Sequence, residues 1–215
     1  MSALKVGWII FVITAAVSFY VIGTAPAGIE VPVHWGADGN VDRYGSVMEA
    51  MLVPPGAMAL VLGIISALKW FEPRQENLKR SNTARGWIAL SVVLLMMVLH
   101  AGTVALVYGY EAPMLRLVFF GIGLTLTVMG NFLSKIRSNF FLGIRTPWTL
   151  SSDEVWRKTH RLAGKLFMLA GLLLLASAWI VSENSLTYAV VGLVLPAALI
   201  PAIYSWWLWK KGQNG

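Results

Sequence analysis

The stretch VGWIIFVITAAVSFYVIGTA, residues 6–25, is twenty residues long and contains no charged side chain. Each residue of an α-helix adds about 1.5 Å, so this stretch can cross a hydrocarbon core of roughly 30 Å. Five further apolar runs of about 20 residues or more follow it, at residues 51–70, 87–108, 115–134, 162–181 and 186–209. Together the runs predict an all-α integral membrane protein, a bundle of six transmembrane helices.

The composition fits this prediction and excludes several kinds of site. Hydrophobic residues make up 57% of the 215 residues and charged residues 13%, which is not the balance of a soluble domain. The chain has no cysteine, which excludes disulfides, thiolate metal sites and a cysteine nucleophile. TAPAG at residues 24–28 resembles a weak cleavage site, but the first apolar run exceeds the usual signal-peptide core, so we expect a retained helix.

The basic residues predict the orientation of the helices. If the N-terminus is cytoplasmic, 15 of the 17 lysines and arginines flank the cytoplasmic helix ends, and only Arg43 and Arg116 do not. Such an asymmetry is typical of the cytoplasmic side, so we expect both termini there. Flanks beside anionic lipid then explain the net charge of +7 without a nucleic acid partner.

The histidines give little support for catalysis or metal binding. His34 lies in the predicted outer loop, His100 within the third apolar run and His160 on the inner side. The membrane separates the first from the last, so they cannot share one metal ion or one catalytic dyad. No zinc-protease, Walker A or dinucleotide-binding motif is present. We expect no enzyme activity, no metal and no cofactor, and for His100 a hydrogen bond across helices.

The predicted outer loop, residues 26–48, is rich in turn-forming residues. Asp38 and the alternate residues up to Ser46, followed by Glu49, match the spacing of a calcium loop, but Arg43 stands where that loop requires glycine. A structured loop without a metal is therefore favoured. The loop either caps the bundle or meets an external partner, and in the second case its recognition residues are His34, Trp35, Gly39, Asp42 and Tyr44.

The segment GIRTPWTLSSDEVWRKTHRLAG, residues 143–164, is the densest polar stretch of the chain. Pro147 cannot continue a helix, and Ser151 and Glu154 have the spacing of a capping box. We therefore expect the fifth membrane helix to begin near Ser152. Glu154 and Lys158 stand in the favourable i, i+4 order for an ion pair.

Capping leaves several residues of this region unexplained. Trp156, His160 and Gly164 recur every four residues and so share one helix face. Asn131, near the inner end of the fourth run, is expected to tie two helices together, and Arg145 is expected to form one cluster with Trp148 and His160. We predict that a partner-binding or structural site on the inner face contains Asn131, Asn139, Gly143, Arg145, Thr146, Pro147, Trp148, Glu154, Trp156, His160 and Arg161.

At these residues the chain resembles a known family. SNFFLGIRTPWTLSSDEVWRKTHRLAG (138–164), with Asn131 upstream, resembles the signature of SdpI-family membrane proteins, and VPVHWGADGNVDRYGS (31–46) resembles the N-terminal domain of unknown function that accompanies it. The resemblance implies a bacterial cell-membrane protein that confers immunity to a secreted antimicrobial peptide, the sporulation-delay toxin. It also implies a receptor role, in which the toxin-engaged protein holds a cytoplasmic transcriptional repressor at the membrane.

The residues and the resemblance together predict a multi-pass immunity protein that binds its toxin, contacts membrane lipids and makes no direct contact with nucleic acid. Residues 1–71 are expected to form a two-helix hairpin with an extracellular loop at 26–48. Residues 72–215 are expected to form a four-helix SdpI-like region with a cytoplasmic motif at 135–165. The alternative from another class is a transporter or exporter of a small or amphipathic compound.

Overall fold

Six long helices make up most of the computed structural model, which describes residues 1–36 and 38–213. Each contains a stretch long and apolar enough to cross a membrane. Large apolar side chains such as Val12, Leu172 and Ile203 point away from the bundle, as expected for surfaces in contact with lipid. By length and composition, the chain is a multi-pass membrane protein. The helices are α1 (Ala3–Thr24), α2 (Val47–Phe71), α4 (Asn82–Val107), α5 (Met114–Leu133), α7 (Asp153–Ile180) and α8 (Glu183–Gln213).

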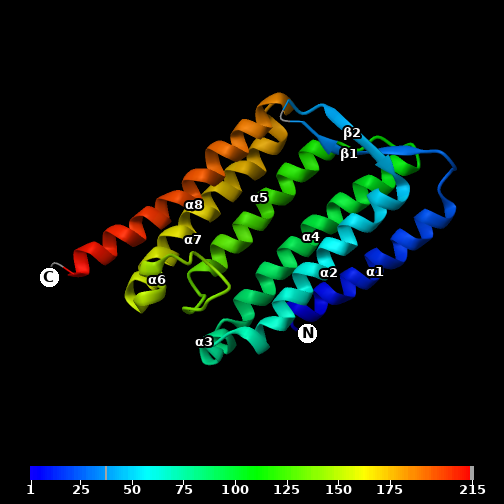
Figure 1. Ribbon diagram of the computed structural model, residues 1–215. Helices are drawn as coiled ribbons and strands as arrows, with labels where there is room; N and C mark the ends of the chain where they lie inside the picture. The colour runs from blue at the N-terminus through cyan, green and yellow to red at the C-terminus, as the bar shows by residue number, and fades with distance from the viewer. Residues whose placement is uncertain (37, 214–215) are drawn as a thin grey trace.

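The helices lie side by side with their axes roughly aligned (Figure 1). Helices α1, α2 and α4 pack against one another, α4 also packs against α5, and α7 packs between α5 and α8. The contact between α5 and α7 is the most extensive of these. A Cβ added at Gly130 would lie 2.7 Å from the carbonyl oxygen of Gly164, and one at Gly171 would lie 2.6 Å from that of Gly123. Glycine at these positions therefore allows the close backbone approach expected of small residues in membrane helices.

Ser18 of α1 satisfies two polar groups within the apolar bundle. Pro55 has no backbone N–H, so the carbonyl of Met51 lacks its partner within α2. The hydroxyl of Ser18 lies 2.8 Å from this carbonyl oxygen and 2.8 Å from Nε2 of His100 in α4. These contacts tie three helices together and confirm the expected hydrogen bond of His100 across helices.

The two ends of the bundle carry different short elements (Figure 1). At one end, strands β1 (Glu30–Trp35) and β2 (Val41–Ser46) form an antiparallel hairpin between α1 and α2. We call this the hairpin end. The opposite end, here the motif end, carries both termini, the short helices α3 (Gln75–Arg80) and α6 (Pro147–Ser151), and a connecting loop at residues 134–146.

Because of this β-hairpin the fold is mostly helical and is not purely α-helical. This corrects the expectation of an all-α protein. The N–H of Gly36 donates to the carbonyl of Asn40 at 2.8 Å, and Gly39 adopts a φ of +82°, which glycine tolerates best. Val31 is buried against Val21 and Met51 at the ends of α1 and α2. The apolar side chains of β1 therefore anchor the hairpin to the bundle, and this anchoring gives the outer segment its regular structure.

Candidate functional site

At the motif end, a buried carboxylate fastens the connecting loop to the end of α2. Glu72 directly follows α2 and is 1% exposed. Its Oε1 accepts a hydrogen bond of 2.9 Å from the N–H of Arg74, and its Oε2 accepts one of 2.9 Å from the N–H of Phe140. A buried carboxylate requires such donors, because an unpaired buried charge is strongly unfavourable. Glu72 thus joins the loop to the N-terminal part of the chain.

Arg74 makes a second connection between the same segments. One terminal nitrogen of its guanidinium group donates to the hydroxyl of Ser138, and the other donates to the carbonyl of Leu150 at 3.0 Å. The group also lies 4.8 Å from the ring centroid of Phe140. Nearby, the Asn77 amide donates to the Ser138 carbonyl at 2.9 Å. Segments before α4 and after α5 are therefore held as one unit at the motif end.

Asn139, one of the predicted site residues, organises the connecting loop itself. Its side chain is fully buried. Its Oδ1 accepts hydrogen bonds from the N–H groups of Phe141 and Leu142 at 2.9 and 2.7 Å, and its Nδ2 donates to the carbonyls of Arg137 and Leu142 at 2.9 and 3.2 Å. These four bonds use the full capacity of the amide. No polar atom of this side chain remains for a ligand.

Trp156 and His160 share one face of α7, as their spacing predicts. Their rings stack with centroids 4.0 Å apart and an angle of 19° between the planes. Both residues are buried. The indole N–H of Trp156 donates to the carbonyl of Ile136 at 2.8 Å, which holds the connecting loop against α7.

The hydrogen bonds of His160 define its proton position. Nδ1 lies 2.9 Å from the carbonyl oxygen of Trp156, which can only accept, so Nδ1 carries the proton. Nε2 then accepts from the N–H of Ile144 at 3.0 Å. Both bonds require the neutral ring. Gly143 adopts a φ of +98°, and a Cβ there would collide with Nε2 of His160. Both the backbone conformation and the lack of space therefore favour glycine at this position.

Thr146 and Thr149 fix the start of α6 and link it to α8. The side chain of Thr146 accepts from the N–H of Thr149 at 3.2 Å, and that of Thr149 accepts from the N–H of Thr146 at 2.9 Å. This reciprocal pair is a capping box with Pro147 in the first turn. The Thr146 hydroxyl also lies 3.0 Å from that of Ser205 in α8.

The start of α7 corrects one expectation. The N-cap is Ser152, whose hydroxyl accepts from the N–H of Val155 at 3.3 Å, and the predicted cap Ser151 instead donates to the carbonyl of Trp148 at 3.0 Å. Ser151 is the last residue of α6, so it is helical when a cap must be extended. The predicted pair of Glu154 and Lys158 is confirmed at 2.6 Å on an exposed surface.

Several other predicted residues lie at the surface of the motif end. Arg145 is exposed and donates to the carbonyl of Phe140 at 3.1 Å. Asn131 is also exposed, and its Oδ1 accepts from Lys135 at 3.4 Å, so it does not join two helices as expected. Arg161 is exposed, whereas His160 is fully buried. The expected cluster of Arg145 with His160 is therefore divided into an exposed and a buried part, and Trp148 is half-buried.

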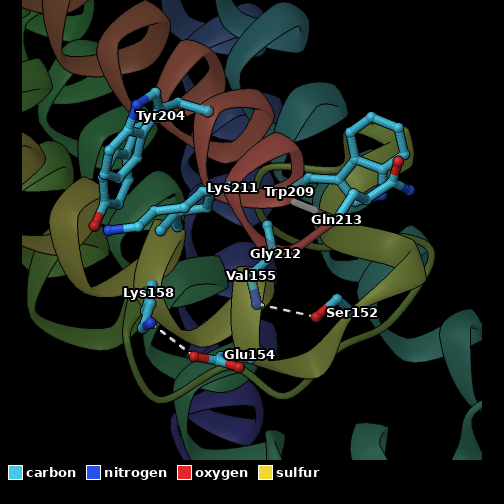
Figure 2. Close-up of a pocket in the computed structure, with 11 residues that line it drawn as sticks. Ser152, Glu154, Val155, Lys158, Tyr204, Trp209, Lys211, Gly212 and Gln213 are labelled. Atoms are coloured by element: carbon cyan, nitrogen blue, oxygen red, sulfur yellow. Dashed lines mark hydrogen bonds and ion pairs between the residues drawn. The ribbon is translucent and has the colours of Figure 1, made fainter. Parts of the chain in front are cut away.

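An open groove of about 720 Å³ separates the first turns of α7 from the last turns of α8 (Figure 2). Its α7 side carries Ser152 and the pair of Glu154 and Lys158. On the α8 side, the rings of Tyr204 and Trp207 stack with centroids 5.7 Å apart. Aromatic surface beside charges of both signs suits the binding of an amphipathic segment.

At the hairpin end, one exposed contact connects two of the recognition candidates. Nδ1 of His34 lies 2.6 Å from Oδ1 of Asp42. The exposed carboxylate of Asp38 accepts from the side-chain amide and the backbone N–H of Asn40 at 2.8 and 3.2 Å, and these two bonds lower the pKa of Asp38 below its ordinary value. Two of the three carboxylates of the calcium register, Asp38 and Asp42, are thus bound by neighbours within the hairpin.

Arg43, the residue that disfavours a calcium loop, pairs directly with the last residue of that register. Its guanidinium donates to the Glu49 carboxylate at 2.6 Å. Among residues 1–36 and 38–213, no group of three histidines or carboxylates is arranged to hold a metal ion.

Trp35 stands between two apolar crevices at the hairpin end. It lines a crevice of about 170 Å³, rimmed by the Arg43–Glu49 pair, and another of about 210 Å³ beside Gly39. The ring is half-buried and packs against the cluster formed by α5, α7 and α8. Tyr44 is 56% exposed on β2. Of the predicted recognition residues, Trp35 and Gly39 therefore line cavities, and Tyr44 faces outward.

Two parts of the chain match models of known protein families. Residues 135–205 match the model of the SdpI/YfhL protein family. Residues 9–59 match the domain of unknown function DUF1648. The immunity protein SdpI of Bacillus subtilis (strain 168) is 23% identical over 182 residues, which cover 85% of this chain and 84% of that protein. No solved structure matches the chain significantly.

The SdpI/YfhL match and the observed contacts overlap only in part. The matched segment contains the connecting loop, α6, α7 and most of α8. Glu72, Arg74, Asn77 and Ser81, which hold the loop, lie outside both matched segments. No motif in the sequence predicts these four residues as part of the site. The only local signal was an isolated glutamate directly after a membrane-length apolar run.

Proposed function

We propose that this chain is a bacterial cell-membrane immunity protein that protects against a secreted antimicrobial peptide of the sporulation-delay type. Protection would come from binding, without chemical turnover and without a cofactor. The observation that carries this proposal is the similarity to an immunity protein over most of both chains. The SdpI/YfhL match over residues 135–205, which include most of the connecting loop and α6, supports it.

The proposal includes an orientation and a division of the chain. The basic residues favour a cytoplasmic motif end with both termini, and the hairpin end then faces outward. By function, residues 1–71 would form the outward-facing receptor part and residues 72–215 the inward-facing SdpI-like part. The two parts would differ in function but are not separate structural domains, because α4 packs against α1 and α2 as well as against α5.

Engagement of the peptide is proposed at the hairpin end, around Trp35. The crevice under the hairpin combines apolar walls from Leu99 and Met114 with the charged rim of Arg43 and Glu49. An antimicrobial peptide that acts on membranes is amphipathic, and such a crevice fits one apolar side chain and its polar flank. Tyr44 and the His34–Asp42 pair would add contacts from the exposed hairpin surface.

A second role is proposed for the motif end, where a cytoplasmic repressor would dock when the toxin is bound. The supporting observation is the groove between α7 and α8, with its stacked Tyr204 and Trp207 beside Lys158. The groove adjoins α6, which is linked to α8 through Thr146 and Ser205. A movement of α8 relative to α7 would change the shape of the groove.

Survival of toxin-sensitive cells tests the proposed function. A strain without its own immunity protein should survive the secreted peptide when it expresses this chain and die when it carries an empty vector. Death at normal membrane abundance of the chain would contradict the proposal for that toxin.

Vesicles separate binding from transport, the alternative function. Proteoliposomes that contain the chain should retain labelled peptide at their surface, and the label should not accumulate inside. Accumulation that requires the chain would favour the transporter and contradict neutralisation by binding.

A further inference from the structure

A second cavity at the motif end has an unusual lining. It measures about 470 Å³ and lies between the end of α3, the first residues of the connecting loop and the start of α7. We call it the basic pocket. Five of its seven lining residues are cationic, and none is a carboxylate; the six that matter here are Arg80, Ser134, Lys135, Arg137, Arg157 and Arg161.

These cations are largely without acidic partners. Arg80 pairs with Glu76 at 3.3 Å, but both side chains are exposed and such a pair is weak. Within the described ranges 1–36 and 38–213, Arg137, Arg157 and Arg161 form no ion pair within 4 Å of a carboxylate, and Arg157 interacts with the nearby Glu154 carboxylate only at longer range. Cations gathered around one cavity repel each other, so an anion within the cavity would be bound favourably.

The walls of the basic pocket are held in place by contacts that do not use its cations. The backbone N–H of Arg137 donates to the Ser81 hydroxyl at 2.9 Å. The neighbouring carbonyl of Ile136 accepts from the indole of Trp156 at 2.8 Å. Arg157 and Arg161 are one helical turn apart, so they lie on the same face of α7. The cations thus extend from a fixed frame, which lowers the cost of ordering them around a ligand.

The position of the pocket indicates where its anion comes from. Lys135 lies 4.7 Å from the ring centroid of Phe132, in the last turn of α5. Phe132 in turn stacks on Trp87 of α4 with centroids 6.0 Å apart. Aromatic rings at the ends of membrane helices lie at the level of the lipid headgroups, so the basic pocket opens at that level.

We propose that the basic pocket binds the phosphate of an anionic phospholipid headgroup. Guanidinium groups bind phosphate oxygens in pairs of parallel hydrogen bonds, and four arginines line this pocket together with Ser134. One bound headgroup would bridge α3, the connecting loop and α7, and would set how the motif end sits on the membrane. This inference does not depend on the proposed immunity function.

The test measures phospholipid binding to the purified full-length chain in detergent by native mass spectrometry. The pocket variant is Arg137→Gln/Arg157→Gln/Arg161→Gln. The matched control, Lys69→Gln/Lys79→Gln/Lys210→Gln, removes three cations from the same end outside the pocket. A cation near an anionic lipid contributes about fivefold in affinity. We therefore expect phosphatidylglycerol to bind the pocket variant on the order of a hundredfold more weakly than the parent chain. We expect it to bind the control as tightly as the parent chain.

Several outcomes would overturn the proposal. One is that phosphatidylcholine binds as tightly as phosphatidylglycerol, and another is that the pocket variant and the control lose the same affinity for phosphatidylglycerol. A third is that millimolar inorganic phosphate saturates the pocket, which would indicate a site for free phosphate. An acidic peptide that displaces the lipid from the parent chain and from the control alike would indicate a protein partner instead. If the triple variant fails to fold, the single glutamine variants decide, each with an expected loss of about fivefold.

Discussion

The two ends of the bundle are built from different kinds of interaction. At the hairpin end, ion pairs such as Arg43–Glu49 join side chains that are exposed to solvent. At the motif end, Glu72, Asn139 and His160 are each at most 1% exposed and bonded to backbone groups. Exposed pairs stabilise a protein by up to about 1 kcal/mol, whereas a buried polar group left without its partner costs about 1–3 kcal/mol.

This difference separates folding from recognition. Substitutions among the buried residues of the motif end are expected to lower the free energy of unfolding. Substitutions of exposed hairpin residues such as Tyr44 are expected to leave folding nearly unchanged and to alter what the protein binds. The groove and the basic pocket, which carry exposed side chains at the motif end, should behave like the hairpin in this respect.

Cysteine labelling should show an all-or-none difference between the ends, the largest effect expected. The chain has no native cysteine. Asp42→Cys should react with a membrane-impermeant maleimide on intact cells, and Gln75→Cys should react only after permeabilisation. Labelling of Gln75→Cys from outside would reverse the proposed orientation of both ends.

The substitution Glu72→Ala should cause the largest loss of stability. It leaves the N–H groups of Arg74 and Phe140 without their acceptor, and we expect a loss of about 3 kcal/mol in the free energy of unfolding. Chemical denaturation in detergent micelles measures it. The control Glu76→Ala, on an exposed pair, should change this free energy by less than about 0.5 kcal/mol. Equal effects would remove the distinction between buried and exposed contacts.

The substitution Gly143→Ala should follow, with a loss of about 2 kcal/mol. A methyl group would be placed at a φ of +98° and against Nε2 of His160. At Gly192, in α8, no neighbouring atom lies within 4 Å of an added Cβ, so Gly192→Ala should be neutral or stabilise by up to about 1 kcal/mol. Thermal unfolding in detergent distinguishes the two, and a tolerated Gly143→Ala would show that the loop can move away from His160.

Ser152→Ala should have the smallest measurable effect, about 1 kcal/mol, because it removes the side-chain cap of α7. Ser151→Ala should cost only a few tenths of a kcal/mol, since the Ser151 hydroxyl is exposed and bonds a carbonyl of its own helix. The same unfolding measurement ranks the two variants. The reverse order would restore Ser151 as the cap.

Much of the fold could be predicted because it depends on local sequence. An apolar run of membrane length is visible in any single stretch, and so is the four-residue spacing that places Trp156 beside His160. The predicted cap of α7, Ser151, lies one residue before the observed cap, Ser152, because Ser151 belongs to the short helix α6. A capping box is present at the start of α6 instead, between Thr146 and Thr149. Its N3 residue is a threonine and not the usual glutamate or glutamine.

The residues that hold the motif end could not be predicted, because their contacts join distant segments. Glu72 and Phe140 are 68 residues apart, and Asn77 and Ser138 are 61 apart. No periodicity connects such pairs. The hairpin was missed for a related reason: β2 is short and polar, and packing of Val31 on α1 and α2 holds the strands in place.

Binding of the peptide toxin to the purified chain tests the central claim most directly, namely that the hairpin end recognises and the motif end responds. Trp35→Ala and Tyr44→Ala should each weaken binding at least about tenfold, as expected for aromatic anchors. Trp179→Ala, an exposed tryptophan at the same end that lines neither crevice, should bind like the parent chain. Arg145→Ala and Trp148→Ala should also bind normally, yet fail to protect or signal in cells. Normal binding by Trp35→Ala and Tyr44→Ala, with binding lost in Arg145→Ala, would contradict the account.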